Sequence, residues 1–310
     1  KIPEAGLKLL KEKCQLTINK HDRPLTRKEL LAMVKDKDAL LCLLNDKIDQ
    51  EVINANPNLK IIANYAVGYD NIDLKATGNI PVTNTPDVLT DAVADLAFLL
   101  MMAAARRLVE SDKFLRAGKY KGWKPDLLVG QAVAGKTLGI LGLGRIGKAV
   151  AKRASGFGMR IIYYDAFRDT NFETETKTTF VAVDELLKTS DFISIHVPLL
   201  PSTKHMISTK QFNMMKRSAI LVNTSRGPVI DEKALVQALK RKRIFAAGLD
   251  VFENEPALTP GLAKLENVII VPHIGSATVE ARNAMAELAA KNILAVLDGK
   301  QPLTPVKKPS

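Results

Sequence analysis

Three short apolar runs in the C-terminal part of the chain are each followed at once by polar residues. The runs are Ala219–Val222, Ala246–Leu249 and Val268–Val271. Short runs of this kind indicate buried strands of a parallel sheet. The carboxyl ends of such strands meet at one edge, where open α/β sheets bind their ligands. We therefore expect the segments that follow the three runs to form one site.

These segments supply an arginine, a glutamate and a histidine, namely Arg226, Glu255 and His273. Arginine pairs with carboxylates through its planar, permanently charged fork, and histidine exchanges a proton near neutral pH. A neighbouring glutamate favours the charged imidazolium, which keeps the acid loaded for reduction. The set is therefore suited to reducing a 2-oxo acid: Arg226 binds the substrate and polarises its carbonyl, His273 transfers the proton, and Glu255 orients His273.

A glycine turn upstream predicts the hydride donor. The sequence Gly142–Gly147 follows the expected strand Thr137–Leu141 and opens an expected helix, Lys148–Phe157. A glycine pattern between a strand and a helix is far more specific than the pattern alone. We predict a dinucleotide site in which Gly142 permits the tight turn, Gly144 lets the backbone approach the pyrophosphate, and Gly147 allows close packing of helix on strand.

Asp165 ends the next expected strand and favours NAD over NADP. Its carboxylate accepts hydrogen bonds from the adenosine ribose and repels a 2′-phosphate. Arg168 lies three residues further on and has the opposite preference, because its side chain can turn toward such a phosphate.

The composition is that of a globular cytoplasmic protein. Its 310 residues are enough for two domains, 46% are hydrophobic, and the only cysteines are Cys14 and Cys42. The longest apolar stretch, Leu96–Ala105, is half a membrane span and predicts a buried helix. The net charge of +12 is spread along the chain, so we expect a basic surface and no nucleic-acid partner. No histidine–cysteine cluster has metal-ligand spacing, so we expect no metal.

Two α/β units are expected along the chain. Residues 1–85 alternate helices and short strands, and Thr26 with Glu29 predicts a capped helix start. A long helix, about Val88 to Arg107, leads to a polar arm, Gly118–Gly130, and a second α/β run follows. His205 is interpreted as a helix-start residue.

The motifs together resemble the D-isomer-specific 2-hydroxyacid dehydrogenases. They comprise Gly142–Gly147, Thr224–Gly227, Asp250–Pro256 and Pro272–Thr278. Asn64–Asp73 and Thr85–Thr90 are most similar to the glyoxylate/hydroxypyruvate reductase branch. In that family, Arg226, Glu255 and His273 fall on catalytic positions.

The resemblance implies two Rossmann-like or flavodoxin-like lobes with parallel sheets and an active site in the interdomain cleft. The substrate lobe would comprise residues 1–85 completed by 277–310, and the NAD-binding lobe residues 86–276. Val67 and Gly68 would present backbone N–H groups to the substrate carboxylate. The remaining positions would hold the cofactor, with the pyrophosphate on the glycine turn, the ribose on Asp165, and the nicotinamide side farther along the chain: Leu143, Arg145, Ile146, Thr224, Asp250 and Gly275. A homodimer with the arm around Trp123 in its interface is also implied.

The same residues are compatible with other functions. Within the family these are D-lactate, 2-oxogluconate and phosphoglycerate dehydrogenases, and outside enzymology an NAD-sensing interaction protein like the corepressors that share the residue set. The chain opens at Lys1 where relatives have just finished a first strand, so we also expect about ten further residues upstream.

Overall fold

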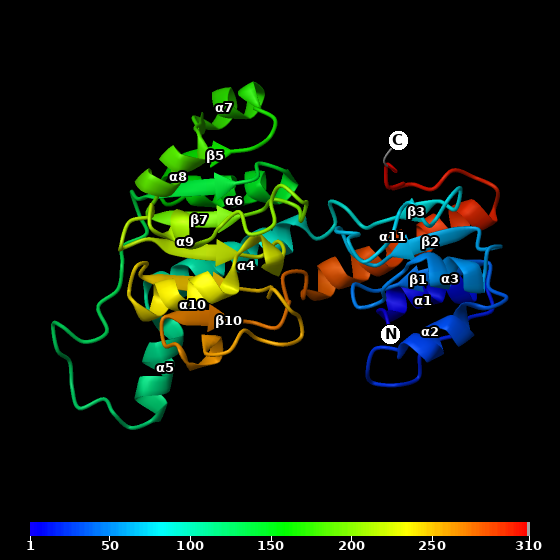
Figure 1. Cartoon of the computed structure of the whole chain (residues 1–310), viewed down its shortest axis with the longest axis horizontal. Coiled ribbons are helices and arrows are strands. Elements are labelled where there is room, and N and C mark those ends of the chain that lie inside the picture. Colours follow the sequence, from blue (N-terminus) through cyan, green and yellow to red (C-terminus); the bar gives the residue numbers. More distant parts are fainter. Residues whose placement is uncertain (309–310) are drawn as a thin grey trace. The chain divides into compact units, whose positions relative to one another are not determined.

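The structure, a computed structural model, describes residues 1–308 and divides the chain into two compact units (Figure 1). One unit comprises Lys1–Leu89 together with the segment from Ser276 onward, and the other comprises Thr90–Gly275. Both are built on parallel sheets. Among residues 1–308, no helix combines the length and the apolar character that crossing a bilayer requires.

The first unit holds a three-stranded parallel sheet in the order β1-β2-β3, with helices on both faces. Leu30, Val52 and Ile62 belong to the core on one face, and Ile61 and Ile293 to the core on the other. Its elements are β1 (Ala39–Cys42), β2 (Ile61–Asn64), β3 (Val82–Thr83), α1 (Glu4–Lys11), α2 (Arg27–Val34), α3 (Gln50–Ala55) and α11 (Val279–Leu297).

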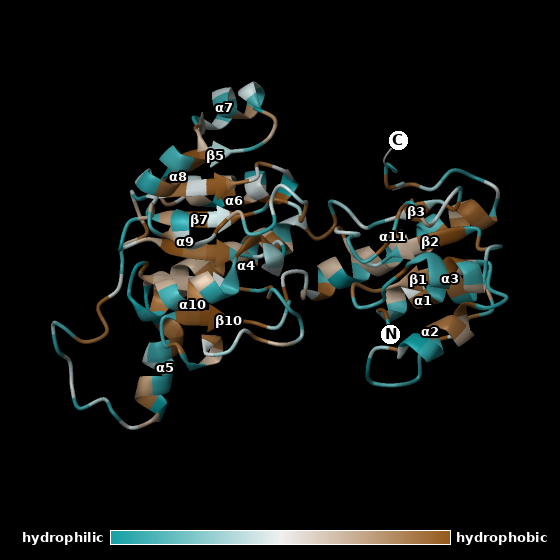
Figure 2. Ribbon diagram, in the orientation of Figure 1, coloured by the Kyte–Doolittle hydropathy of each residue, from teal (hydrophilic) through white to brown (hydrophobic). Residues whose placement is uncertain are grey.

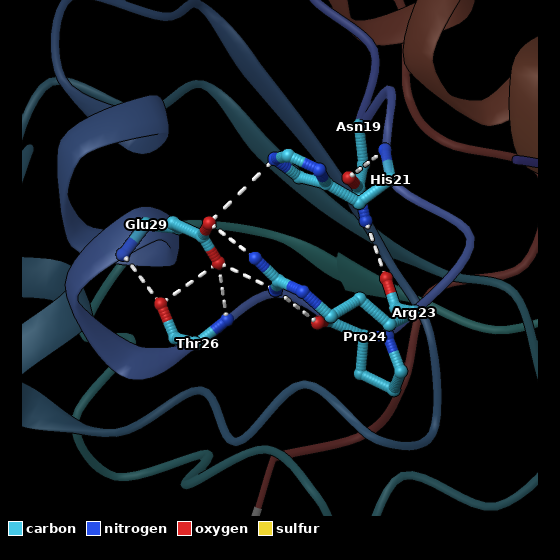
Figure 3. Close-up of polar contacts among 6 residues, drawn as sticks. All are labelled: Asn19, His21, Arg23, Pro24, Thr26 and Glu29. Atoms are coloured by element: carbon cyan, nitrogen blue, oxygen red, sulfur yellow. Dashed lines mark hydrogen bonds and ion pairs between the residues drawn. The ribbon is translucent and has the colours of Figure 1, made fainter.

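Helix α2 begins at a capping box, as the sequence predicts (Figure 3). The hydroxyl of Thr26 accepts a hydrogen bond from the Glu29 N–H, and the Glu29 carboxylate accepts one from the Thr26 N–H at 2.7 Å. Arg23 pairs with the same carboxylate through both terminal nitrogens. The interaction satisfies N–H groups that the first turn of a helix would otherwise leave unpaired.

The second unit holds a seven-stranded parallel sheet in the order β10-β9-β8-β7-β4-β5-β6. The strand order reverses between β4 and β7, so the turn after β4 lies at the switch point where such sheets bind ligands. Its elements are α4 (Thr90–Ala105), α5 (Leu108–Arg116), β4 (Thr137–Leu141), α6 (Arg145–Ser155), β5 (Arg160–Tyr164), α7 (Thr170–Thr176), β6 (Thr179–Phe180), α8 (Val183–Thr189), β7 (Phe192–Ile195), α9 (Thr209–Phe212), β8 (Ile220–Asn223), η1 (Gly227–Val229), α10 (Glu232–Lys240), β9 (Ala246–Leu249), η2 (Leu262–Lys264) and β10 (Val268–Ile270).

Alternate residues of these strands face two separate cores. Ile220 and Val222 of β8 pack on the face that carries α4 and α6, whereas Leu221 packs on the face that carries α8, α9 and α10. Burial on both faces explains why the strands read as continuous apolar runs and are largely brown in Figure 2.

The long helix expected at about Val88 to Arg107 corresponds to α4, and a further helix that the sequence analysis did not predict follows it. Helix α4 ends at Ala105, and Arg107 adopts a left-handed backbone with φ of 50° before α5 begins at Leu108. The arm after α5 projects away from the sheet of its own unit (Figure 1). Trp123, which belongs to this arm, is 80% exposed.

Candidate active site

The carboxyl ends of β8, β9 and β10 carry the three loops that the sequence singles out. The strands are neighbours in the sheet, and each of the two pairs is in parallel register. All three loops therefore leave the sheet at the same edge. Arg226 follows β8, Glu255 follows β9, and His273 follows β10.

The Arg226 loop packs directly on the backbone of the Glu255 loop. A Cβ added at Gly227 would lie 1.9 Å from the carbonyl carbon of Phe252, so only glycine fits there. The side chain of Asn223 donates to the Arg226 carbonyl at 2.9 Å, which fixes the turn that carries the arginine. This glycine contact is what brings the two loops together.

His273 and Glu255 form a hydrogen-bonded pair. His273 Nδ1 lies 3.0 Å from Glu255 Oε2, and the other carboxylate oxygen accepts a hydrogen bond from the Phe252 N–H at 2.9 Å. Burial alone would raise the pKa of Glu255, but His273, the Phe252 N–H and the charge of Arg226 lower it below its ordinary value. The three predicted side chains thus interact electrostatically at one edge of the sheet.

Asp250 fixes the backbone of the histidine loop. This buried carboxylate accepts hydrogen bonds from the Ile274 N–H at 2.6 Å and the Gly275 N–H at 2.8 Å. Desolvation raises the pKa of Asp250 despite these two bonds. Gly275 leaves room for the carboxylate, because a Cβ at this position would lie 2.9 Å from Asp250 Oδ2. In this structure Asp250 and Gly275 therefore support the position of His273.

A second set of contacts, which no local sequence pattern predicts, supports the Glu255 loop. The buried Glu232 accepts from the Glu253 N–H at 2.6 Å, and Glu253 accepts from the Glu232 N–H at 3.1 Å. His205 Nε2 lies 2.7 Å from Glu253 Oε1. The expectation that His205 starts a helix is wrong: α9 begins at Thr209 behind its Ser208 cap, and His205 sits in a turn with φ of 51°.

The glycine turn after β4 is shaped for a dinucleotide. Gly142 has φ of +94°, and a Cβ there would lie 2.8 Å from the His196 carbonyl carbon. A Cβ at Gly144 would meet no atom within 4 Å, so the turn presents open space at the start of α6, which begins with Arg145 and Ile146. Gly147 packs on Gly142, since a Cβ would lie 2.2 Å from its carbonyl oxygen. These are the three glycine roles that a pyrophosphate site requires.

Two polar groups at the carboxyl ends of other strands of this sheet fit the rest of a dinucleotide. Within residues 1–308 the buried hydroxyl of Thr224, directly after β8, is one of four that have no hydrogen-bond partner, so it can donate to a polar group of a dinucleotide. Asp165 at the end of β5 accepts a hydrogen bond from the Leu143 N–H at 2.7 Å. This bond holds the carboxylate beside the glycine turn.

His196 directly follows β7, lies next to the same turn and has a structural role in this fold. Its Nε2 lies 2.8 Å from the Ser194 hydroxyl. Burial lowers the pKa of His196 to about 4, so the ring is neutral at physiological pH.

Val67 and Gly68 lie in the other unit, in the loop after β2. Both are half-buried, and their carbonyls accept hydrogen bonds from asparagine side chains.

Comparison with known proteins agrees with this reading of the fold. The family model described as "D-isomer specific 2-hydroxyacid dehydrogenase, NAD binding domain" matches residues 98–275. The chain is 54% identical to a glyoxylate reductase from Korarchaeum cryptofilum over 97% of this chain and 92% of that protein. It is 52% identical to a glyoxylate reductase from Thermococcus litoralis, over 99% and 95% of the two chains.

Solved structures show the same architecture. The TT0316 protein from Thermus thermophilus superposes with a TM-score of 0.92 at 44% identity, covering 99% of this chain and 97% of that one. An NADPH-dependent glyoxylate/hydroxypyruvate reductase from Sinorhizobium meliloti, solved with NADP and malonate, gives a TM-score of 0.87 at 34% identity, with 99% and 94% covered.

The parallel sheet with its glycine turn at the switch point, taken with these relatives, defines a nicotinamide-dependent oxidoreductase. The chain belongs to the D-isomer-specific 2-hydroxyacid dehydrogenase family. Both the family and the branch expected from the sequence are confirmed, and the alternative of an NAD-sensing interaction protein is not favoured.

Proposed function

We propose that this protein reduces glyoxylate to glycolate with a nicotinamide dinucleotide as hydride donor. The observation that carries the proposal is the electrostatically linked set of Arg226, Glu255 and His273 at one edge of a dinucleotide-binding sheet. Relatives that are 50–54% identical over more than nine-tenths of their length are glyoxylate reductases. Hydroxypyruvate, the second substrate of the Sinorhizobium relative, belongs in the same assay.

The residues divide the reaction between them. When bound, the nicotinamide supplies a hydride to the keto carbon. Arg226 holds the substrate carboxylate and polarises the carbonyl, together with the backbone N–H groups of Val67 and Gly68. Because Nδ1 of His273 faces Glu255, its Nε2 is the nitrogen that gives a proton to the developing alkoxide. Glu255 holds the ring in this orientation and stabilises its positive charge.

The first test mixes the purified protein with NADH and glyoxylate and measures the loss of NADH absorbance. We expect rapid oxidation with glyoxylate, and slower or comparable oxidation with hydroxypyruvate and pyruvate. Failure to oxidise either NADH or NADPH with any of the three 2-oxo acids would contradict the proposal.

We infer a preference for NADH from the surroundings of Asp165. A 2′-phosphate would meet this carboxylate, and like charges placed together cost binding energy. Arg168 is the cation that could pair with the phosphate. Its guanidinium instead donates to both carboxylate oxygens of Glu173, each at 2.8 Å. We expect kcat/KM for NADPH to be at least about tenfold below that for NADH.

Two substitutions test this inference. Asp165→Ser removes the repulsion and is expected to narrow the gap between the coenzymes. Adding Glu173→Gln weakens the ion pair that holds Arg168 and should bring the kcat/KM values for NADH and NADPH still closer. Glu173→Gln alone should change the ratio of these two values little. Equal use of both coenzymes by the unaltered protein would contradict the assignment of Asp165.

A homodimer formed through the arm is the assembly that the exposed apolar side chains support. Leu115, Tyr120, Trp123 and Val129 are 62%, 48%, 80% and 59% exposed. So many large apolar groups on one segment mark an interaction surface.

Sedimentation at equilibrium should give twice the chain mass, and Trp123→Asp should shift the protein toward monomer. A monomer at micromolar concentration without any substitution would refute the dimer.

The compartment that we propose is the cytoplasm. Cys42 is buried and Cys14 half-buried, and both are free thiols. Unpaired thiols persist in a reducing environment.

A further inference from the structure

The ends of β2 and β3 hold the Val67–Gly68 loop by its carbonyl groups. The Asn84 side chain, directly after β3, donates to the Val67 carbonyl at 2.7 Å, and the Thr85 N–H donates to the Ala66 carbonyl at 2.8 Å. The Asn64 side chain, at the end of β2, donates to the Gly68 carbonyl at 2.8 Å. Two consecutive peptide groups of the loop are therefore anchored to residues 84 and 85.

This anchoring sets the direction of the two N–H groups that the proposed function gives to the substrate. In a trans peptide the C=O and N–H groups point in opposite directions. The Ala66 carbonyl shares its peptide with the Val67 N–H, and the Val67 carbonyl shares its peptide with the Gly68 N–H. Because residues 84 and 85 bind both carbonyls, both N–H groups point away from the end of β3.

The C-terminal tail in turn holds Asn84. The Thr304 hydroxyl donates to the Asn84 carbonyl at 2.7 Å, and the Asn84 N–H donates to the Thr304 carbonyl at 3.3 Å. Asn292, fully buried on α11, accepts from the Thr304 N–H at 3.0 Å and donates to its hydroxyl at 2.8 Å. Next to Thr304, Pro305 bridges Thr83 in antiparallel fashion. A continuous chain of hydrogen bonds thus joins α11 to the loop.

We propose that Asn84 and Thr304 are positioning residues for the substrate carboxylate, so that the C-terminal tail forms part of the specificity apparatus. The proposal rests on the function given above to the Val67 and Gly68 N–H groups. The Asn84 side chain orients the Gly68 N–H directly, its neighbour Thr85 orients the Val67 N–H, and Thr304, fixed by Asn292, holds Asn84 in place. Neither side chain touches the substrate.

The test separates substrate binding from turnover. Asn84→Ala and Thr304→Val should each raise KM for glyoxylate about fivefold, the worth of one net hydrogen bond, while kcat changes less than twofold. The affinity for NADH, measured by fluorescence titration, should not change. The double variant should lose less than the sum of the two, because both act through the same loop.

Two matched controls isolate the positioning effect from simple loosening of the unit. Thr304→Ser keeps the hydroxyl, so its KM for glyoxylate should equal that of the unaltered protein. Lys308→Met removes the contacts of the Lys308 ammonium group with the Gly78 and Ile80 carbonyls, farther along the tail. It should lower thermal stability without changing KM.

Amide hydrogen exchange gives a readout that does not need turnover. A peptide spanning residues 65–71 should exchange faster in Asn84→Ala than in the unaltered protein. Faster exchange without a rise in KM, or no change in exchange, would overturn the positioning role while glyoxylate reduction by the unaltered protein stands. If the unaltered protein leaves glyoxylate untouched, the proposed function fails and this inference fails with it.

Discussion

Replacement of His273 by asparagine is expected to lower kcat for glyoxylate reduction by about 10²–10⁴-fold, the usual contribution of a positioned acid. His273 is 3.0 Å from Glu255 through Nδ1, so its other nitrogen carries the proton that the alkoxide needs. Asparagine is close in size and polar, but it has no proton to give at neutral pH. KM should change little, because binding of the carboxylate falls to Arg226 and the backbone N–H groups.

The measurement is a steady-state rate at saturating NADH, with the far-ultraviolet circular dichroism of the variant as a check on folding. Glu255→Gln is the matched companion. It keeps an oxygen that can accept the hydrogen bond from His273 but removes the charge that stabilises the imidazolium, so its kcat should fall by a smaller factor. A His273→Asn variant with a near-normal kcat would remove His273 from the reaction.

Local signals in the sequence were sufficient for most of the second unit. The strands Thr137–Leu141 and Ala246–Leu249 lie where the sequence predicts them. Each is an apolar run buried on both faces, so the two ends of the run show where the strand begins and ends. The start of a new helix, α5, directly after α4 was harder to predict, because Ala105–Leu108 contains no glycine or proline. Helix α4 stops there through the left-handed conformation of Arg107, whose guanidinium is paired with Glu110.

The contacts that support the site depend on tertiary packing that no local pattern reports. Glu232 reads as an ordinary acidic residue in the first turn of α10, yet it binds the Glu253 backbone of a loop twenty-one positions away. Asn84 and Thr304 are separated by 220 positions, and their pairing follows from the path of the tail along β3. The prediction that His205 starts a helix was wrong for the same reason, since its partner Glu253 comes from a distant loop. The residues proposed for catalysis could be predicted because their loops follow apolar strands, whereas the long-range contacts of Glu232 and Thr304 leave no local pattern in the sequence.

Arg226→Ala is expected to have an effect of similar size on kcat/KM, a loss of about 10²–10⁴-fold. Removing one member of a hydrogen-bonded charge pair costs about 2–5 kcal/mol, part of which is the substrate carboxylate left without its counter-ion. Unlike the histidine variant, this one should raise KM and lower kcat together, since the arginine also polarises the carbonyl. Steady-state kinetics over a wide range of glyoxylate concentrations give both constants.

Arg226→Lys and added guanidinium distinguish charge from geometry. Lysine keeps the positive charge but not the planar fork, so it should recover only part of the lost kcat/KM. Guanidinium chloride at millimolar concentration should partly restore Arg226→Ala and leave His273→Asn unchanged, because only the former lacks this group. The charge of Arg226 also helps to lower the pKa of Glu255, so in Arg226→Ala that pKa should rise toward its ordinary value. If Arg226→Ala retained the KM and kcat of the unaltered protein, the substrate carboxylate would have to be bound elsewhere.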